Sequence, residues 1–164
     1  MSCISGKNGI VPCDDHRDCI DKAMEIAERT CSDKQLKFTN LRREILRMIW
    51  EGHGPKKAYD LLSELQLTNQ SAKPATVYRT LEFLIENGFV HKVNSLNAFV
   101  GCSHPLKHQD CYFLICDSCN DISEYCDPAI TSAIKIITDR NQFTVKNTTL
   151  EIAGHCNSCI QHMD

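Results

Sequence analysis

Two closely spaced pairs of cysteines near the end of the chain constrain its fold more than any other feature. The pairs are Cys116-Asp-Ser-Cys119 and Cys156-Asn-Ser-Cys159, with the 36 residues 120–155 between them. Two thiolates at this spacing can face one point from a tight turn, and two such turns complete the tetrahedron that zinc accepts. The spacing therefore predicts a closed, structural zinc site that fastens a late turn of the chain to an earlier one.

Two further interpretations of these four cysteines stay open. Cysteines can simply fill a core or form disulfides, and a Cys-x-x-Cys pair can carry thiol redox chemistry. The redox interpretation expects one reactive cysteine pair beside a βαβ unit. Two cysteine pairs near the end of the chain therefore favour metal binding over redox chemistry. Because a four-thiolate site has no open coordination position, the function has to be sought elsewhere in the chain.

The cysteine content favours a reducing compartment. The 164 residues suffice for one ordinary domain or two small ones, and the eleven cysteines, an odd number, cannot all pair within one chain. Residues 1–12 have no continuous apolar stretch to serve as a signal peptide, and no run approaches the roughly 20 apolar residues of a membrane helix. We therefore expect a soluble, cytoplasmic protein without a membrane partner.

The charges of the chain are segregated along its length. The net charge is −3, but residues 1–33 carry 4 basic and 7 acidic side chains, residues 34–101 carry 10 and 6, and residues 102–164 carry 4 and 8. A basic middle indicates a surface that faces DNA, because a local patch steers binding more than the total charge does. On charge alone, an ordinary solvated helical surface explains the pattern about as well.

The periodicity of apolar residues divides the chain into three parts. Residues 1–15 have little periodicity and are expected to form a mobile arm. Helical spacing recurs over residues 17–34, 40–51, 58–65 and 74–87, and a period of two follows over 89–93 and 98–101 around a turn at 94–97. Helices followed by a β-hairpin describe a winged helix-turn-helix, which we assign to residues 16–101.

The remaining residues, 102–164, are expected to form a second, small α/β unit. The predicted elements are strands over residues 112–116, 122–125 and 143–152 and a helix over 128–140, before the last cysteine pair. The predicted fold class is therefore α+β, with a winged helix followed by a small unit that contains the structural zinc site.

The helix that begins at residue 74 is the candidate reader of DNA. In a helix-turn-helix the second helix enters the major groove, and its early residues, here Thr76, Tyr78 and Arg79, meet base edges. Arg79 can make a bidentate contact to guanine, and Tyr78 can pack on a thymine methyl or reach a phosphate. Arg42 and Lys57 are candidate phosphate contacts. Without the preceding helices, a surface arginine and a tyrosine that covers the helix would be the simpler explanation.

Four further potential ligands lie where the two predicted units meet. They are His91 in the wing, Cys102 directly after it, His108 in the connection and Glu124 in the second unit. No spacing rule selects them, and His91 or Glu124 taken singly is more often an ordinary surface residue. Two neutral imidazoles, one thiolate and one carboxylate would balance the charge of a divalent ion, and the thiolate favours zinc over harder ions.

Several motifs resemble a known family. The segment Lys73-Pro-Ala-Thr-Val-Tyr-Arg-Thr-Leu81 resembles the recognition helix of the ferric uptake regulator family, and Gly88-Phe-Val-His-Lys-Val93 with Cys102 resembles its zinc uptake regulator branch. The resemblance covers about residues 17–160. It implies a winged-helix DNA-binding domain, a C-terminal dimerisation domain and metal-dependent repression of uptake genes.

The resemblance also assigns roles to particular residues. It places the structural zinc on Cys116, Cys119, Cys156 and Cys159, the regulatory zinc on His91, Cys102, His108 and Glu124, and the base-reading pair on Tyr78 and Arg79. Two segments depart from the family pattern. Thr39-Asn40-Leu41-Arg42 replaces the usual Thr-Pro-Gln-Arg, and the histidine-rich stretch before the first cysteine pair is reduced to His104 and His108. Either histidine can therefore be the loop ligand.

The function expected from the sequence is zinc-responsive repression of zinc uptake genes by a homodimer that binds operator DNA. Two zinc ions per chain are expected, one structural and one regulatory, with no organic substrate and no catalytic activity. The nearest competing hypothesis is an iron or peroxide sensor of the same family, which would use harder ligands than Cys102. Two hypotheses from different classes are a thiol-disulfide oxidoreductase and a purely structural zinc-ribbon adaptor.

Overall fold

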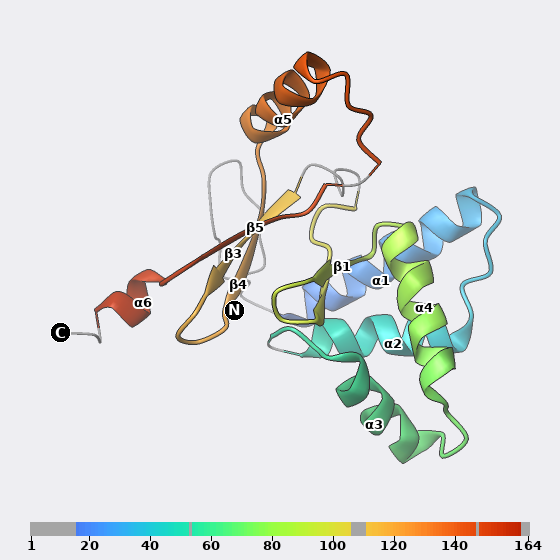
Figure 1. Cartoon of the computed structure of the whole chain (residues 1–164). Coiled ribbons are helices and arrows are strands. Elements are labelled where there is room, and N and C mark those ends of the chain that lie inside the picture. Colours follow the sequence, from blue (N-terminus) through green and yellow to red (C-terminus); the bar gives the residue numbers. More distant parts are fainter. Residues whose placement is uncertain (1–15, 53, 106–110, 147, 162–164) are drawn as a thin grey trace. The chain divides into compact units, whose positions relative to one another are not determined.

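The chain divides into two compact units, of which the first runs to Ser103 and the second begins at His104. The computed structural model describes residues 16–52, 54–105, 111–146 and 148–161, and Figure 1 shows the order of the elements. The first unit contains α1 (His16–Asp33), α2 (Asn40–Glu51), α3 (Ala58–Thr68), α4 (Pro74–Glu86), β1 (Val90–Val93) and β2 (Ala98–Gly101). The second unit contains β3 (Cys111–Cys116), β4 (Ile122–Cys126), α5 (Pro128–Arg140), β5 (Leu150–Gly154) and α6 (Asn157–Ile160).

The ends of the helices in the first unit follow from local side-chain chemistry. The Thr39 side chain caps α2 by accepting a hydrogen bond from the backbone N–H of Arg42 at 3.4 Å. Pro74 occupies the first turn of α4, where its missing N–H is not needed. Gly88 follows α4 and has φ 76°. This left-handed conformation commonly ends a helix, and glycine adopts it more readily than any other residue. These local signals explain where α2 and α4 begin and where α4 ends, in agreement with the helices expected over residues 40–51 and 74–87.

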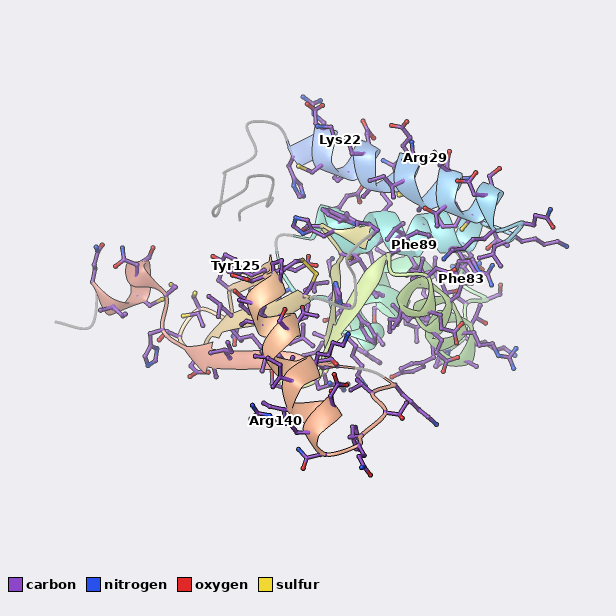
Figure 2. The ribbon with its side chains drawn as sticks, turned by 90° about the horizontal axis from the view of Figure 1, so that it is seen from above. Lys22, Arg29, Phe83, Phe89, Tyr125 and Arg140 are labelled. Atoms are coloured by element: carbon purple, nitrogen blue, oxygen red, sulfur yellow. A yellow bond between two sulfur atoms is a disulfide. The ribbon has the colours of Figure 1, made fainter. Side chains whose placement is uncertain are left out.

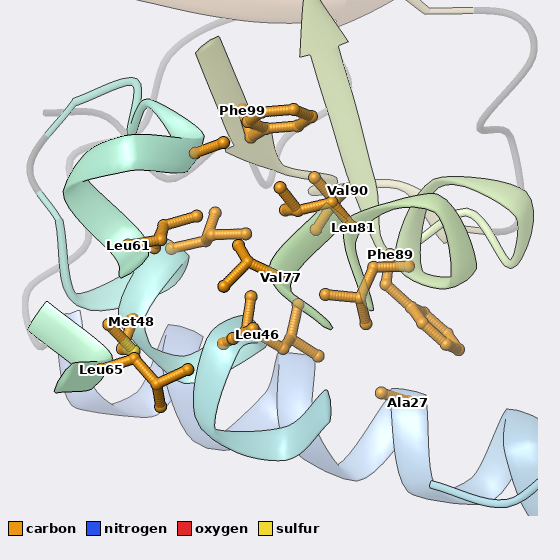
Figure 3. Packing of buried hydrophobic residues seen from close by; sticks show 14 of the residues in the cluster. Ala27, Leu46, Met48, Leu61, Leu65, Val77, Leu81, Phe89, Val90 and Phe99 are labelled. Carbon is orange, nitrogen blue, oxygen red and sulfur yellow. The ribbon is translucent and has the colours of Figure 1, made fainter. Parts of the chain in front are cut away.

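The core of the first unit draws apolar side chains from all four helices and from the hairpin (Figure 3). Leu46 of α2, Leu61 of α3 and Leu81 of α4 are each at most 1% exposed. Burial of one such side chain stabilises the fold by about 1.5–3 kcal/mol. The apolar stripes expected from periodicity therefore do face inward, which leaves the opposite face of α4 available for a ligand.

The β-hairpin completes a winged helix in the first unit. Strands β1 and β2 pair antiparallel with Val90 opposite Gly101 and Val93 opposite Ala98. An isolated bridge joins Lys56, before α3, to Phe99 of β2 through two backbone hydrogen bonds of 2.9 and 2.8 Å. Because this bridge fastens the hairpin to the start of α3, the wing is held against the helices that carry the candidate DNA-reading residues.

The second unit contains a three-stranded sheet in the order β4-β3-β5. Strand β3 pairs antiparallel with β4 and parallel with β5, and α5 lies in the connection between β4 and β5. The strand predicted over residues 143–152 is wrong in its first part, because only Leu150–Gly154 pairs with β3. Phe143 instead closes the end of α5, where its N–H donates to the Thr138 carbonyl at 2.9 Å and Gln142 has φ 51°.

A disulfide joins Cys111 and Cys126 across the β3–β4 pair, visible in Figure 2 as a yellow bond close to Tyr125. The two residues stand directly opposite each other in the strand register. Next to them, the rings of Tyr112 and Tyr125 stack with 5.8 Å between their centroids. No pattern in the sequence predicts this pairing, because a separation of 15 residues matches no cysteine motif.

Among the helices that the structure describes, none has the length and apolarity needed to cross a membrane. Most of the large apolar side chains that the described residues expose to solvent belong to the second unit, where α5 has no buried residue. Ile136 and Ile137 of α5 are 51% and 60% exposed, and Phe143 directly after it is 65% exposed. Such side chains in contact with water indicate a surface that a partner covers.

Candidate metal centre and nucleic-acid interface

The four cysteines of the two predicted pairs come together in the second unit. Their four sulfur atoms all lie within 4.8 Å of one another. The Sγ atoms of Cys119 and Cys156 are 3.8 Å apart. Four soft donors at this spacing are the ligand set that tetrahedral zinc requires, so the residues fit the metal that the spacing implied.

Two turns position these sulfurs. After β3, the Asn120 N–H donates to the Cys116 carbonyl at 2.8 Å, and Asn120 takes the left-handed conformation with φ 56°. The Asp117 N–H donates to the Gly154 carbonyl at 2.8 Å, which fastens this turn to the end of β5. Because β5 leads directly to Cys156 at the start of α6, the parallel pairing of β3 and β5 brings the second turn to the first.

The thiols of this cluster differ in acidity. The backbone N–H of Cys156, which is 3.3 Å from the Cys116 sulfur, and the N–H of Cys119 lower the pKa of Cys116 to about 6. Hydrogen bonds with the thiols of Cys156 and Cys119 raise the pKa of Cys159 to about 12. Backbone donors aimed at one sulfur therefore prepare it as a thiolate, which is the form that binds metal.

The candidate base-reading residues all lie on the outward face of α4. Thr76, Tyr78 and Arg79 are exposed, with Tyr78 at 53%. Val77 and Leu81, on the opposite face, are each 1% exposed and anchor the helix in the core. In the part of the chain that the structure describes, Arg79 has no hydrogen-bond or ion-pair partner. Its guanidinium is therefore available to an external acceptor.

The two candidate phosphate contacts differ in their surroundings. Lys57 is exposed at the start of α3. Arg42 is half-buried, stacks its guanidinium 3.4 Å from the centroid of the Phe83 ring, and donates a hydrogen bond to the Lys37 carbonyl. Because these contacts hold the Arg42 side chain against its own unit, Lys57 is the more accessible of the two cations.

A hollow of ≈ 270 Å³ lies between α3, α4 and the hairpin. Its lining includes Lys57, Tyr78 and Lys92, together with Tyr59, which is 75% exposed. Tyr59 was missed as a candidate from the sequence, because one exposed tyrosine on a helix gives no periodic signal. Its position beside Lys57 on the helix that precedes the reading helix is the feature that could have suggested it.

The candidate regulatory ligands are distributed over both units. His91 of β1 is 8% exposed, and Cys102, whose N–H donates to the Phe89 carbonyl at 2.9 Å, is 2% exposed. Glu124 of β4, in the second unit, is 6% exposed, whereas His108 lies outside the described residues. Burial alone assigns these three side chains no binding role, because each of them already interacts with another part of the chain.

A further group of potential ligands lies entirely within the second unit. His104, Glu124 and Cys126 each offer one ligand atom, and the three atoms lie within 4.8 Å of one another. In the sequence, His104 was a candidate only in place of His108, and Cys126 had no predicted role. Glu124 and Cys126 lie two residues apart in β4 and therefore on one face of that strand, whereas no local spacing connects either of them to His104.

Comparison with known proteins extends over both units. The sequence model of the Ferric uptake regulator family matches residues 33–153. The Zinc uptake regulation protein of Escherichia coli (strain K12) is 36% identical over 138 residues, which cover 82% of this chain and 80% of that protein. A solved zinc uptake regulator complexed with zinc and DNA has a TM-score of 0.82 and 33% identity, covering 87% of this chain and 96% of that chain. The crystal structure of holo XcZur has a TM-score of 0.78 and 39% identity over 86% of this chain and 99% of that chain.

Proposed function

We propose that this chain, which belongs to the ferric uptake regulator family, is a zinc-responsive repressor that binds operator DNA and controls zinc uptake genes in the cytoplasm. The observation that carries the proposal is the outward face of α4, where Thr76, Tyr78 and Arg79 are exposed on a winged helix. The similar solved structure is of a zinc uptake regulator bound to both zinc and DNA. Family members are transcription regulators, which supports a binding role rather than catalysis.

The DNA contacts divide into reading and positioning. Arg79 suits the paired acceptors of guanine in the major groove, and Tyr78 suits a thymine methyl or a phosphate. Lys57 and Lys92, which line the same hollow as Tyr78, suit phosphates on the flanking backbone. Thr76 supplies a further hydroxyl at the start of the helix. Arg42 then acts mainly by holding α2 against α4 through its stacking on Phe83.

Two zinc ions per chain fulfil different tasks in this proposal. The first binds Cys116, Cys119, Cys156 and Cys159, where four thiolates leave no position open and metal binding contributes to folding. The second binds His91, Cys102, Glu124 and a loop histidine, His108 or His104. Cys102 is the residue that favours zinc over the iron or peroxide sensors of the family, because a thiolate is a soft ligand.

Zinc at the second set would act by restricting a hinge. His91 and Cys102 belong to the first unit and Glu124 to the second, so one ion bound by all of them would tie the units into one orientation. A dimeric reader needs its two recognition helices about 34–36 Å apart, or a multiple of that distance. An untied hinge populates this spacing only part of the time, so DNA affinity should follow zinc occupancy.

The exposed apolar surface of the second unit supports a homodimer. Leu114 of β3 and Ile152 of β5 are register partners on one face of the sheet and are 40% and 42% exposed. Among the described strands, β5 pairs only with β3 and therefore forms an edge. Together with the exposed apolar residues of α5, this surface would be covered by a second copy of the chain, as the interfaces of symmetric dimers require.

A thiol-disulfide oxidoreductase is the competing function from another class. Its reactive disulfide would be expected within one Cys-x-x-Cys pair. The structure instead joins Cys111 to Cys126, which belong to neither pair, and groups the four paired cysteines at metal-ligand spacing. The arrangement of sulfurs therefore favours a metalloregulator.

Substitution of Cys102 tests the proposal. Operator binding of the parent and of Cys102→Ser is titrated at controlled free zinc, beside a measurement of zinc per chain. The variant should keep the structural zinc, the fold and the dimer but lose zinc-stimulated DNA binding. Cys19→Ser, in half-buried Cys19 of α1, is the matched control and should respond as the parent does. An unchanged response of Cys102→Ser would refute the assignment of the sensing site.

A further inference from the structure

The group of His104, Glu124 and Cys126 combines three different metal-ligand types in one unit. The three ligand atoms lie within 4.8 Å of one another, and Glu124 is 6% exposed. The Nδ1 atom of His104 is buried, yet no hydrogen-bond partner for it occurs among the described residues. An unsatisfied buried nitrogen costs about 1–3 kcal/mol and is rare in folded proteins, so it indicates a missing ligand at this place.

The same group contains a cysteine that is not available as a ligand in this structure. Cys126 is bonded to Cys111, and a disulfide sulfur cannot act as the thiolate that binds a metal ion. Reduction by two low-molecular-weight thiols breaks the sulfur–sulfur bond, oxidises the two thiols to their own disulfide and leaves Cys111 and Cys126 as thiols. The reverse exchange with an oxidised low-molecular-weight disulfide restores the bond.

We propose that His104, Glu124 and Cys126 form an additional zinc site that can be filled only when the Cys111–Cys126 disulfide is reduced. A neutral imidazole, a carboxylate and a thiolate together carry the two negative charges that balance a divalent ion, and the thiolate selects zinc over harder ions. Three protein ligands leave the fourth tetrahedral position open, so zinc here is exchangeable rather than structural.

Cys111 is the resolving thiol of this site. It stands opposite Cys126 in the strand register, so forming the disulfide withdraws Cys126 from the metal without breaking the β3–β4 pairing. Because only the reduced state binds zinc here, zinc must in turn favour the reduced state and slow disulfide formation. The site therefore makes zinc occupancy of the second unit dependent on thiol redox conditions.

The site shares Glu124 with the proposed regulatory set, and it also shares His104 if that histidine rather than His108 is the loop ligand there. It uses no residue of the first unit, and the proposal of this site does not depend on the zinc-responsive DNA binding proposed above. A Cys102→Ser background is suited to its test, because this substitution disables the regulatory set but leaves His104, Glu124 and Cys126 in place.

The experiment counts zinc in the full-length Cys102→Ser protein with its four-cysteine cluster already loaded. Protein reduced with a phosphine should bind one further zinc equivalent that a chromophoric chelator removes, whereas protein treated with oxidised glutathione should bind none. His104→Ala in this background should lower the affinity for the further zinc ion by at least about tenfold. Loss of even an outer-shell partner of a metal ligand lowers metal affinity by about 10–100-fold.

Two cysteine substitutions in the same background form a matched pair. Both Cys111→Ser and Cys126→Ser abolish the disulfide, but only Cys111→Ser keeps the ligand. In phosphine-reduced protein we therefore expect Cys111→Ser to bind the further zinc and Cys126→Ser to bind none. Equal zinc content of the reduced and oxidised parent, or identical zinc binding by the two variants, would overturn the proposal and leave the disulfide with a purely structural role. His104→Ala likewise tests whether the further zinc binds at this site, and it alters no residue of β3 or β4, whereas the two cysteine substitutions do.

DNA binding by the protein that retains Cys102 keeps the two proposals distinguishable. Loss of the further zinc equivalent in the Cys102→Ser background contradicts only the redox-dependent site. An unchanged zinc response of DNA binding in Cys102→Ser contradicts only the regulatory assignment.

Discussion

Gly101 at the end of β2 lies directly against the indole ring of Trp50 in α2, so closely that a Cβ atom on Gly101 would overlap the ring. The carbonyl of Trp50 in turn accepts a hydrogen bond of 2.7 Å from His16 Nε2 at the start of α1. One aromatic residue therefore connects the wing, α2 and α1. The absence of a side chain at Gly101 allows the wing to approach α2.

The first prediction follows from this contact. Gly101→Ala should lower the free energy of unfolding of the first unit by about 1–3 kcal/mol, because an added methyl group in a tight contact must displace its neighbour. Gly54→Ala is the matched control, since a Cβ there meets no atom within 4 Å. Fluorescence of Trp50, the one tryptophan of the chain, reports urea unfolding of this unit. Equal unfolding midpoints for the two variants would contradict the close packing.

The second prediction separates base reading from phosphate contact. Arg79→Ala should weaken binding to a matched duplex by about 1–3 kcal/mol and relax the preference at one base position. Lys57→Ala should weaken binding to all duplexes alike and reduce the salt dependence, because a phosphate contact carries no sequence information. Titrations of matched and scrambled duplexes at several salt concentrations measure both effects. An Arg79 variant with an intact sequence preference would exclude α4 from the reading role.

The third prediction concerns the four-cysteine cluster. Cys156→Ser or Cys119→Ser should remove zinc from the second unit, unfold it and abolish the dimer, since metal binding and folding are coupled in structural sites. Zinc content, thermal unfolding and sedimentation check this result, with Cys19→Ser as the control. A zinc-loaded dimer of unchanged stability would show that the cluster is not the structural site.

The fourth prediction uses the acidity of Cys116. Its pKa is lowered from 9.0 to about 6, so in the folded, metal-free protein Cys116 is protonated below about pH 6 and a thiolate above it. Zinc binding should therefore displace up to one proton fewer near pH 7.5 than near pH 5. Cys159, with a pKa raised to about 12, should release its proton throughout this range. Calorimetry in buffers of different ionisation enthalpy measures the protons released, and an increase toward high pH would contradict the assignment.

The fifth prediction concerns the apolar surface of the second unit. Ile152→Glu should raise the dissociation constant of the dimer about 10- to 100-fold, because the buried side chain contributes about 1.5–3 kcal/mol. Leu67→Glu is the control, since Leu67 is an apolar residue of α3 in the first unit and is 84% exposed. Sedimentation over a range of concentrations checks the result. Equal self-association of the two variants would place the dimer interface elsewhere.

The sequence by itself determined those features that depend on residues close together in the chain. The four helices, the hairpin and the glycine cap at Gly88 follow from periodicity and from start and stop signals, which act within a few residues. The cysteine pairs were recognisable for the same reason, because each pair lies within one turn. The motif of α4 further led to the family, which the comparisons confirm.

The strand predicted over residues 143–152 shows where local pattern was insufficient. Phe143 and Val145 alternate with polar residues as a strand would, but Phe143 closes the end of α5 and only Leu150–Gly154 finds a partner in β3. Strand pairing depends on a neighbour that can be far away in the sequence, so alternation alone does not decide which residues pair.

Only the tertiary structure decided the relationships between distant residues. The β3–β4 register placed Cys111 opposite Cys126, and the same fold brought His104 to Glu124 and Cys126. The contact between Gly101 and Trp50 likewise depends on how the wing packs against α2. No spacing rule encodes such proximities, because they arise when strand pairing and core packing bring together residues whose separation in the sequence carries no information about their distance in the fold.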